Sequence, residues 1–349
     1  MSFWTGKRVL VTGHTGFKGS WLSEILLARG SDVYGLALEP ETNPALFLQI
    51  DLEDRIDHFV GDIRDPVVVE ERLKAVRPDV VLHLAAQPLV RSSYRSPLES
   101  WTTNVIGTAN ILEALRRFDH RCAVIIVTTD KVYKIRDSES PFCESDRLGG
   151  YDPYSASKAG VEIVADSYRM SFFPDSCIRL ATARSGNAIG GGDWSKDRLF
   201  PDLARAFSKG DSLKIRNPSS VRPWQHVLDP LIGYLKLAEA LVSKNSRKVA
   251  ASFNFGPELR DHKTVGELVG TSAQHWQGNW EYLSEPKAPY EAKRLFLDIN
   301  RAKKQLGWAP RWDFARAVSE TVSWYKHVDH GGDPAEKTRS QITAFESES

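Results

Sequence analysis

The sequence contains few cysteines and no pattern that would make them ligands or redox partners. Only 3 of the 349 residues are cysteines, at positions 122, 143 and 177, and no two of them form a CxxC pair. This spacing argues against a zinc ribbon and against a thioredoxin-type redox pair. Cys122 and Cys177 open apolar runs and are predicted to be small buried hydrophobic residues. We therefore expect no metal site.

The chain also lacks a net charge and a long apolar run. Lys and Arg number 46 against 45 Asp and Glu, which gives a formal net charge of +1 and no electrostatic reason to expect nucleic acid or an anionic membrane as partner. No apolar run approaches the roughly 18 residues that span a bilayer. The first residues lack the basic-then-apolar pattern of a signal peptide. We expect a cytoplasmic protein.

What the sequence does contain begins with a glycine-rich turn. Residues 9–12 are typical of a short buried strand, Gly13, Gly16 and Gly19 follow, and the next residues have the apolar spacing of a helix. Glycines let the backbone approach a pyrophosphate, and a helix N-terminus offers unpaired N–H groups. The spacing is a variant of the dinucleotide-binding fingerprint. The alternative is an ordinary strand-to-helix turn. The position of the glycines, after a strand and at the start of a helix, favours the cofactor interpretation.

The end of the second strand bears on which dinucleotide binds. An acidic residue commonly ends this strand in NAD-binding proteins, but here Ala37 occupies the position and Glu39 comes two residues later. No Arg or Lys stands there to meet a 2′-phosphate, so NAD is favoured over NADP. Asp62 and Ile63, after a short strand near residues 56–65, are candidates for the adenine site, although a surface turn fits them equally well.

Strand and helix patterns alternate from residue 8 to residue 184. This alternation predicts an α/β fold, a Rossmann-type doubly wound parallel sheet with the ligand at the carboxyl ends of the strands. From residue 187 the chain becomes glycine-rich and irregular, which predicts a smaller mixed α/β substrate-binding domain. We expect residues 1–186 plus about 225–256 to bind NAD, and 187–224 plus 257–330 to bind the substrate. The polar residues 331–349 are expected to form a flexible tail.

The strongest local chemical signal is the pair Tyr154 and Lys158. Residues four apart lie on one face of a helix, so the ammonium can lower the phenol pKa from about 10. A phenolate is a competent base for a sugar hydroxyl. Taken alone, the pair is equally compatible with an amphipathic helix that carries a solvated lysine.

In combination the motifs are more specific. The glycine turn, Leu-Ala-Ala-Gln at 84–87, Asn104, Thr-Thr-Asp-Lys-Val-Tyr at 128–133 and Tyr-x-x-x-Lys resemble the extended short-chain dehydrogenase/reductase family from residue 7 to about residue 325. This resemblance implies that Tyr154 and Lys158 act on the hydroxyl that loses its hydride, and that Lys158 also holds the nicotinamide ribose. The implied NAD contacts are Gly13, Gly16, Phe17, Gly19, Asp62, Ile63, Leu84, Ala85, Gln87, Asn104, Thr128, Tyr154 and Lys158.

Residues 129–131 narrow the resemblance to the nucleotide-sugar 4,6-dehydratases of this family, which carry Thr-Asp-Glu there. The resemblance implies that Thr129 binds the sugar and that Asp130 protonates the departing 6-hydroxyl. In those dehydratases the glutamate removes the C5 proton, but here Lys131 stands in its place. This lysine, together with the segments 215–231 and 290–308, resembles the dehydratases that act on CDP-glucose. A lysine is a base only when neutral, so its pKa near 10.4 would have to fall. The alternative is that Lys131 only holds the sugar or the nicotinamide ribose.

The remaining expectations concern the substrate and the assembly. Arg222 matches the arginine of a family Arg-x-Trp motif that meets the substrate diphosphate. The other expected substrate contacts are Gln87, Thr129, Asn187, Arg198 and Arg216. Helices at 97–118 and 153–173 are expected to pair in a homodimer or homotetramer. Two rival functions stay open: a 4-epimerase or a dehydratase for another nucleotide sugar, and a nucleotide-binding regulator without chemistry.

Overall fold

A parallel sheet lies at the centre of the computed structural model, which describes residues 2–136, 140–196, 198–243, 249, 251–283 and 295–348. Its six strands are β1 (Arg8–Thr12), β2 (Asp32–Leu36), β3 (Val80–His83), β4 (Cys122–Val127), β5 (Ile178–Ser185) and β10 (Ser252–Phe255). They lie in the order β10-β5-β4-β3-β1-β2, and all pairs are parallel. This arrangement confirms the doubly wound sheet predicted from the sequence.

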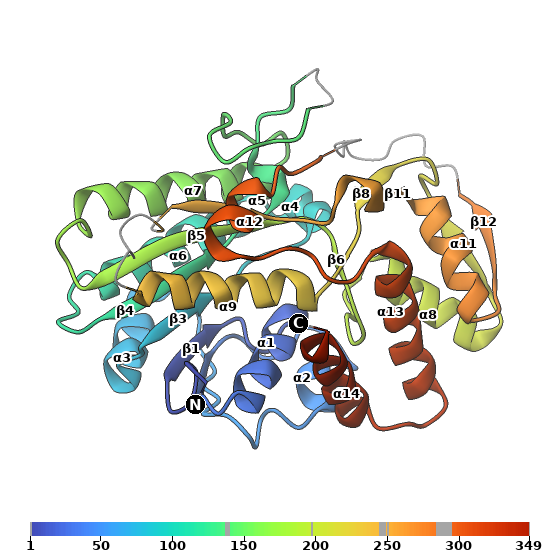
Figure 1. The fold of residues 1–349 in the computed structure, drawn as a ribbon, viewed down its shortest axis with the longest axis horizontal. Coiled ribbons are helices and arrows are strands. Elements are labelled where there is room, and N and C mark those ends of the chain that lie inside the picture. Colours follow the sequence, from blue (N-terminus) through green and yellow to red (C-terminus); the bar gives the residue numbers. More distant parts are fainter. Residues whose placement is uncertain are drawn as a thin grey trace.

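Helices cover both faces of the sheet (Figure 1). On one face, Leu10 of β1 packs in a cluster with α3 (Pro66–Val76), α6 (Gly107–Leu115) and α7 (Pro153–Ser171). On the other, Val9 and Val11 pack in a cluster with α1 (Phe17–Ala28) and α9 (Leu228–Val242). Because side chains alternate along a strand and both faces are buried, the strands are almost continuously apolar.

Shorter elements surround this framework. Three two-stranded sheets pair β8 with β11, β7 with β12, and β6 with β9. Their strands are β6 (Ala188–Ile189), β7 (Ser212–Ile215), β8 (Val221–Pro223), β9 (Gln225–His226), β11 (His262–Thr264) and β12 (Asn279–Tyr282). The remaining helices are α2 (Leu46–Gln49), α4 (Val90–Arg95), α5 (Pro97–Trp101), α8 (Leu199–Lys209), α11 (Val265–His275), α12 (Asn300–Leu306), α13 (Phe314–Asp329) and α14 (Pro334–Ser347), with single 3-10 turns at Asp130–Val132 and Leu259–Asp261. The division into a cofactor domain and a substrate domain stays a prediction. No described helix has the length and apolar character needed to cross a bilayer.

Two predicted elements differ from the structure. The helix expected over residues 97–118 is divided into α5, a π-helical turn over Thr102–Ile106, and α6. The strand expected near residues 56–65 is reduced to isolated bridges from Asp57 and Val60. Phe59 and Val60 are exposed, so this segment has no buried apolar face to hold a longer strand in register.

The flexible tail expected at 331–349 is wrong. Residues 334–347 form helix α14, which Asp333 caps by accepting a hydrogen bond from the Ala335 N–H. Ile342 and Phe345 are buried against the core, and α14 contacts α1 and α2, which places the C-terminus close to the first helices of the chain (Figure 1). Arg339 pairs with Glu24 of α1. The polar composition conceals one apolar stripe at helical spacing, and that stripe decides the structure.

We predict that Phe345→Ala lowers the free energy of unfolding by about 3–5 kcal/mol, because the substitution leaves a cavity in the core. Denaturant unfolding followed by fluorescence measures this change. Thr343→Ala, at an exposed position of the same helix, is the matched control and should leave stability nearly unchanged. Equal stability of the two variants would contradict the docking of α14.

Candidate active site

The glycine turn follows β1, the strand from which β2 lies on one side and β3 and all later strands lie on the other. β1 lies between β2 and β3, and ligands of such sheets bind at the carboxyl ends of the strands on either side of this switch point. Gly13 has a φ of +73°, and a Cβ placed on it would lie 2.7 Å from the Ala85 nitrogen. A Cβ on Gly19 would overlap the Gly13 carbonyl oxygen. Both glycines are therefore required by close backbone approaches.

This turn fits a dinucleotide pyrophosphate. Gly16 is the N-cap of α1 and supplies no side-chain hydrogen bond to the helix, so the first N–H groups of the helix remain available to an anion. A Cβ on Gly16 would lie 3.4 Å from the Gly13 oxygen, an ordinary contact. Gly16 is therefore needed for access to the turn and not for its fold. Phe17 packs beside Gly190, where an added Cβ would lie 3.2 Å from the ring.

The loop after β3 is fixed by Asn104. The Asn104 Oδ1 accepts a hydrogen bond from the Gln87 N–H at 2.8 Å, and its Nδ2 donates to the Gln87 oxygen and to the Ser157 hydroxyl of α7. The Ala85 N–H donates to the Thr12 hydroxyl of β1. Leu84, Ala85 and Gln87 thus lie between the glycine turn and α7, and their contact with a cofactor stays a prediction.

Other predicted cofactor residues have structural partners. The Asp62 carboxylate accepts hydrogen bonds from Arg64, which lower its pKa. Ile63 is buried beneath Gly107, where a Cβ would lie 2.5 Å from the Ile63 Cδ1. The Thr128 hydroxyl donates to Glu162. These contacts do not test whether Asp62, Ile63 and Thr128 also contact the cofactor, so that contact stays a prediction.

Tyr154 and Lys158 lie at the start of α7. Asp152 caps the helix by accepting from the Ser155 N–H, and Pro153 occupies its first position, which is the favoured arrangement for a helix start. Both Tyr154 and Lys158 are buried. The Lys158 ammonium donates to the Val127 carbonyl at the end of β4, at 3.1 Å. The cap fixes where α7 begins, and it therefore helps to place Tyr154 and Lys158 at the carboxyl end of β4.

Burial dominates the charge states of this pair. Burial raises the pKa of Tyr154 to about 12, opposed by a hydrogen bond with Thr129 and by the charge of Arg198. Burial lowers the pKa of Lys158 to about 8, opposed by the carboxylate of Glu162. The predicted lowering of the phenol pKa by Lys158 is wrong for this structure, because desolvation outweighs the positive charge.

Residues 129–132 form the catalytic turn, which follows β4 directly. Thr129 caps this turn, and its hydroxyl donates to the Asp130 Oδ1 at 3.0 Å. Asp130 is only 2% exposed and faces Gly186, where a Cβ would lie 2.9 Å from its Oδ2. Burial raises the pKa of Asp130, opposed by the charges of Lys131 and Arg222. A buried carboxyl with a raised pKa is suited to donate a proton.

The structure places some of the predicted substrate residues near this centre. Arg198, at the start of α8, is 3.9 Å from Asp193 and its charge lowers the pKa of Tyr154. Arg222 of β8 acts on Asp130 in the same way. The Asn187 carbonyl accepts from the Gln225 N–H. Arg216 is half-buried after β7, and its contact with the substrate stays a prediction.

Sequence reasoning missed four functional neighbours. Lys18, inside the glycine turn, donates to the Ser185 hydroxyl at 2.9 Å, and burial lowers its pKa to about 8. His14 lies 2.6 Å from His58 through ring nitrogens, and burial lowers its pKa to about 3. Glu162 and Arg184 form a buried ion pair. Only Glu162 had a signal, because it continues the spacing of Tyr154 and Lys158 by four residues.

Comparison with known proteins shows close relatives. The family described as GDP-mannose 4,6 dehydratase matches residues 10–321. The chain is 43% identical to a CDP-glucose 4,6-dehydratase of Salmonella typhimurium, over 99% of this chain and 97% of the relative. It is 31% identical to a dTDP-glucose 4,6-dehydratase of Streptomyces griseus, over 91% and 94% of the two chains. A crystal structure of the dTDP-glucose 4,6-dehydratase of Streptomyces venezuelae with NAD and TYD bound is 28% identical, with a TM-score of 0.77 over 94% of this chain and 99% of that one.

We predict that Gly16→Ala folds as the parent does but binds NAD, the cofactor expected from the sequence, at least about tenfold more weakly, a loss of about 1.4 kcal/mol. The added Cβ fits the protein and projects where a phosphate must approach. Calorimetric titration with NAD and thermal unfolding provide the two measurements. Gly19→Ala is the contrasting variant and should lower stability itself. Parent-like NAD affinity of Gly16→Ala would remove the turn from the cofactor site.

Proposed function

The chain belongs to the GDP-mannose 4,6-dehydratase family, among the extended short-chain dehydrogenases/reductases, and we propose that it uses NAD to convert CDP-glucose to CDP-4-keto-6-deoxyglucose. One observation supports dehydration above all: Asp130, a buried acid with a raised pKa, lies in the same centre as Thr129 and Tyr154. A 4-epimerase has no hydroxyl to expel and needs no such acid. A binding protein needs neither the acid nor the base.

Oxidation at C4 assigns roles to α7. The glycine turn and Lys158 would hold NAD, which would supply the hydride acceptor for C4 and the hydride donor for C6. Tyr154, as its phenolate, takes the proton of the 4-hydroxyl. Burial disfavours this phenolate, while the hydrogen bond with Thr129 and the charge of Arg198 favour it. Thr129 orients the phenol oxygen through their hydrogen bond.

Loss of water assigns roles to the catalytic turn. The C4 ketone makes the C5 proton acidic, because the electron pair left behind is delocalised as an enolate. Asp130 gives its proton to the 6-hydroxyl, and the C6–O bond breaks with release of water. Lys131 stands next to Asp130 and is our candidate for the base at C5; after C6 has received the hydride, the same group returns a proton to C5. The role of holding the sugar remains its alternative.

The sugar nucleotide is proposed to bind across the centre. Arg198 acts electrostatically on Tyr154 and Arg222 on Asp130, so two guanidinium groups lie near the reacting groups, and guanidinium is a favoured partner for a diphosphate. Identity is higher to the relative named for CDP-glucose than to the one named for dTDP-glucose, 43% against 31%. This difference supports cytosine as the base of the substrate.

We also propose a homodimer, or a homotetramer built from it. Leu98 and Trp101 of α5 and Ile163 and Met170 of α7 are exposed, and α5 contacts α7. Exposed apolar residues that lie over neighbouring helices mark an association surface. With no spanning helix described and a nucleotide sugar as substrate, the proposed compartment is the cytoplasm.

To test the function, the protein is incubated together with NAD and one nucleotide sugar at a time: CDP-glucose, dTDP-glucose, UDP-glucose or GDP-mannose. We expect a product lighter by one water, with the highest kcat/KM for CDP-glucose. A new sugar of unchanged mass would make the protein an epimerase. Tight binding without turnover of any substrate would favour the regulator.

We predict that Asp130→Asn slows turnover of CDP-glucose by about 10²–10⁴-fold, the usual range for loss of a general acid. The substitution keeps the shape and loses the transferable proton. Product formation followed by mass measures the rate. Asp166→Asn changes an exposed carboxylate of α7 and is the control. An Asp130→Asn variant as active as Asp166→Asn would contradict the acid role.

A further inference from the structure

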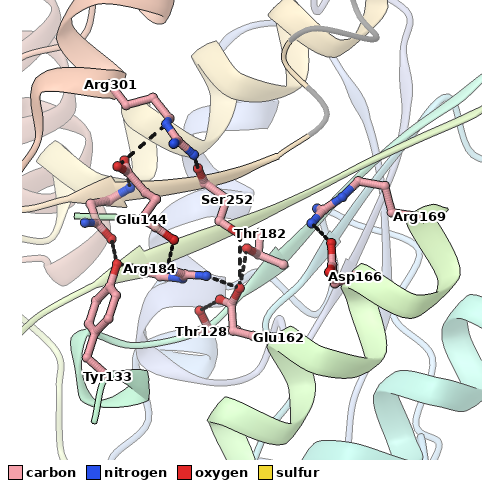
Figure 2. A network of polar contacts seen from close by, with 11 residues as sticks. Thr128, Tyr133, Glu144, Glu162, Asp166, Arg169, Thr182, Arg184, Ser252 and Arg301 are labelled. Atoms are coloured by element: carbon pink, nitrogen blue, oxygen red, sulfur yellow. Dashed lines mark hydrogen bonds and ion pairs between the residues drawn. The ribbon is translucent and has the colours of Figure 1, made fainter. Parts of the chain in front are cut away.

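Glu162 is a carboxylate buried in α7, two turns beyond Tyr154. It accepts hydrogen bonds from the Thr128 hydroxyl at the end of β4, from the Thr182 hydroxyl of β5 at 2.7 Å, and from the Ser252 hydroxyl of β10 at 3.2 Å. Figure 2 shows these side chains converging on it from separate elements. One carboxylate thus connects the catalytic helix with three strands of the sheet.

Arg184 of β5 completes this arrangement (Figure 2). Its Nη2 donates to the Glu162 Oε2 at 2.8 Å, and the two side chains are only 3% and 1% exposed. Its Nη1 donates to the Tyr133 hydroxyl at 2.9 Å, and the guanidinium lies over the Tyr133 ring. The Tyr133 hydroxyl in turn donates to Asn254 at 2.6 Å. Burial raises the pKa of Glu162, but Arg184 and its other partners lower it overall, so the pair is ionised.

Two of the residues that bind this ion pair, Thr128 and Tyr133, flank the catalytic turn. Thr128 precedes Thr129, and Tyr133 follows the turn, so residues 129–132 are held at both ends by one buried unit. Glu162 itself belongs to the helix that carries Tyr154 and Lys158. The ion pair is therefore a buried polar connection between the segment that carries the proposed proton donor and the helix whose residues are proposed to act at C4.

We propose that Glu162 and Arg184 are positioning residues, which fix the catalytic turn against α7 so that Asp130 and Tyr154 act on one bound sugar. This inference rests on the proposed function, in which two reactions take place at neighbouring carbons without release of the intermediate. A misplacement of about 1 Å can cost about 10²-fold in rate. A buried ion pair is weak evidence for stability, whereas fixed geometry is what paired charges and directional hydrogen bonds provide.

The chain offers a matched pair of variants for the test. Thr128→Val and Thr182→Val each remove one hydroxyl that donates to Glu162, both from buried positions. We expect comparable losses of stability, but a kcat for CDP-glucose at least about tenfold lower only in Thr128→Val, at unchanged NAD affinity. Equal kcat in the two variants would overturn the proposal. So would a Thr128→Val defect that saturating NAD abolishes, because Thr128 would then act on the cofactor.

A double-mutant cycle supplies a second test. If Tyr133 acts by holding Asp130, Tyr133→Phe lowers kcat in the parent but has little further effect in Asp130→Asn. The same factor in both backgrounds contradicts the proposal.

Hydrogen exchange gives a readout that does not depend on turnover. The amides of residues 129–132 should exchange faster in Thr128→Val than in Thr182→Val, and equal protection overturns the proposal. An inactive parent with the expected exchange difference would instead count against the proposed function alone.

Discussion

The removal of water from around Asp130, Tyr154 and Lys158 is the constraint on which the active site depends. Desolvation disfavours every charged form, so it raises the pKa of Asp130 and Tyr154 and lowers that of Lys158. For Asp130 this effect favours the protonated form, which the proposed acid role requires. It also makes the phenolate costly, so ionisation of Tyr154 depends on the neighbouring positive charges and on Thr129. The chemistry is thus governed by burial first and by specific partners second.

The sheet makes that burial possible while leaving the site accessible from its carboxyl edge. The connections that follow β1 and β3 lead to opposite sides of the sheet, which makes the switch point. The turn after β1 contains Gly13 and Gly19, where the backbone approaches its neighbours more closely than a Cβ would allow. α7 begins at the same edge with its cap at Asp152. The glycine turn, Tyr154 and Asp130, to which we assign the cofactor, the base and the acid, therefore belong to one framework, although they come from distant parts of the sequence.

The sequence allowed prediction of the parts of this site that depend on local pattern. The glycine spacing, the four-residue spacing of Tyr154 and Lys158, and the alternation of strands and helices all follow from short-range rules, and the doubly wound parallel sheet is confirmed. The phenol pKa was predicted in the wrong direction, because spacing reveals a nearby charge and not the loss of solvent. Helix α14 was missed because its polar majority hides the few apolar residues that dock it. The Glu162–Arg184 pair joins residues 22 positions apart, and no local pattern predicts such a contact.

The central claim is that one site oxidises C4, expels the 6-hydroxyl and reduces C6 without exchange of the transferred hydrogen with solvent. The most direct measurement uses CDP-glucose labelled with deuterium at C4, with mass and NMR analysis of the product. The account predicts a product lighter by one water that carries the deuterium at C6. Deuterium lost to solvent, or a product that keeps the mass of its substrate, would contradict it.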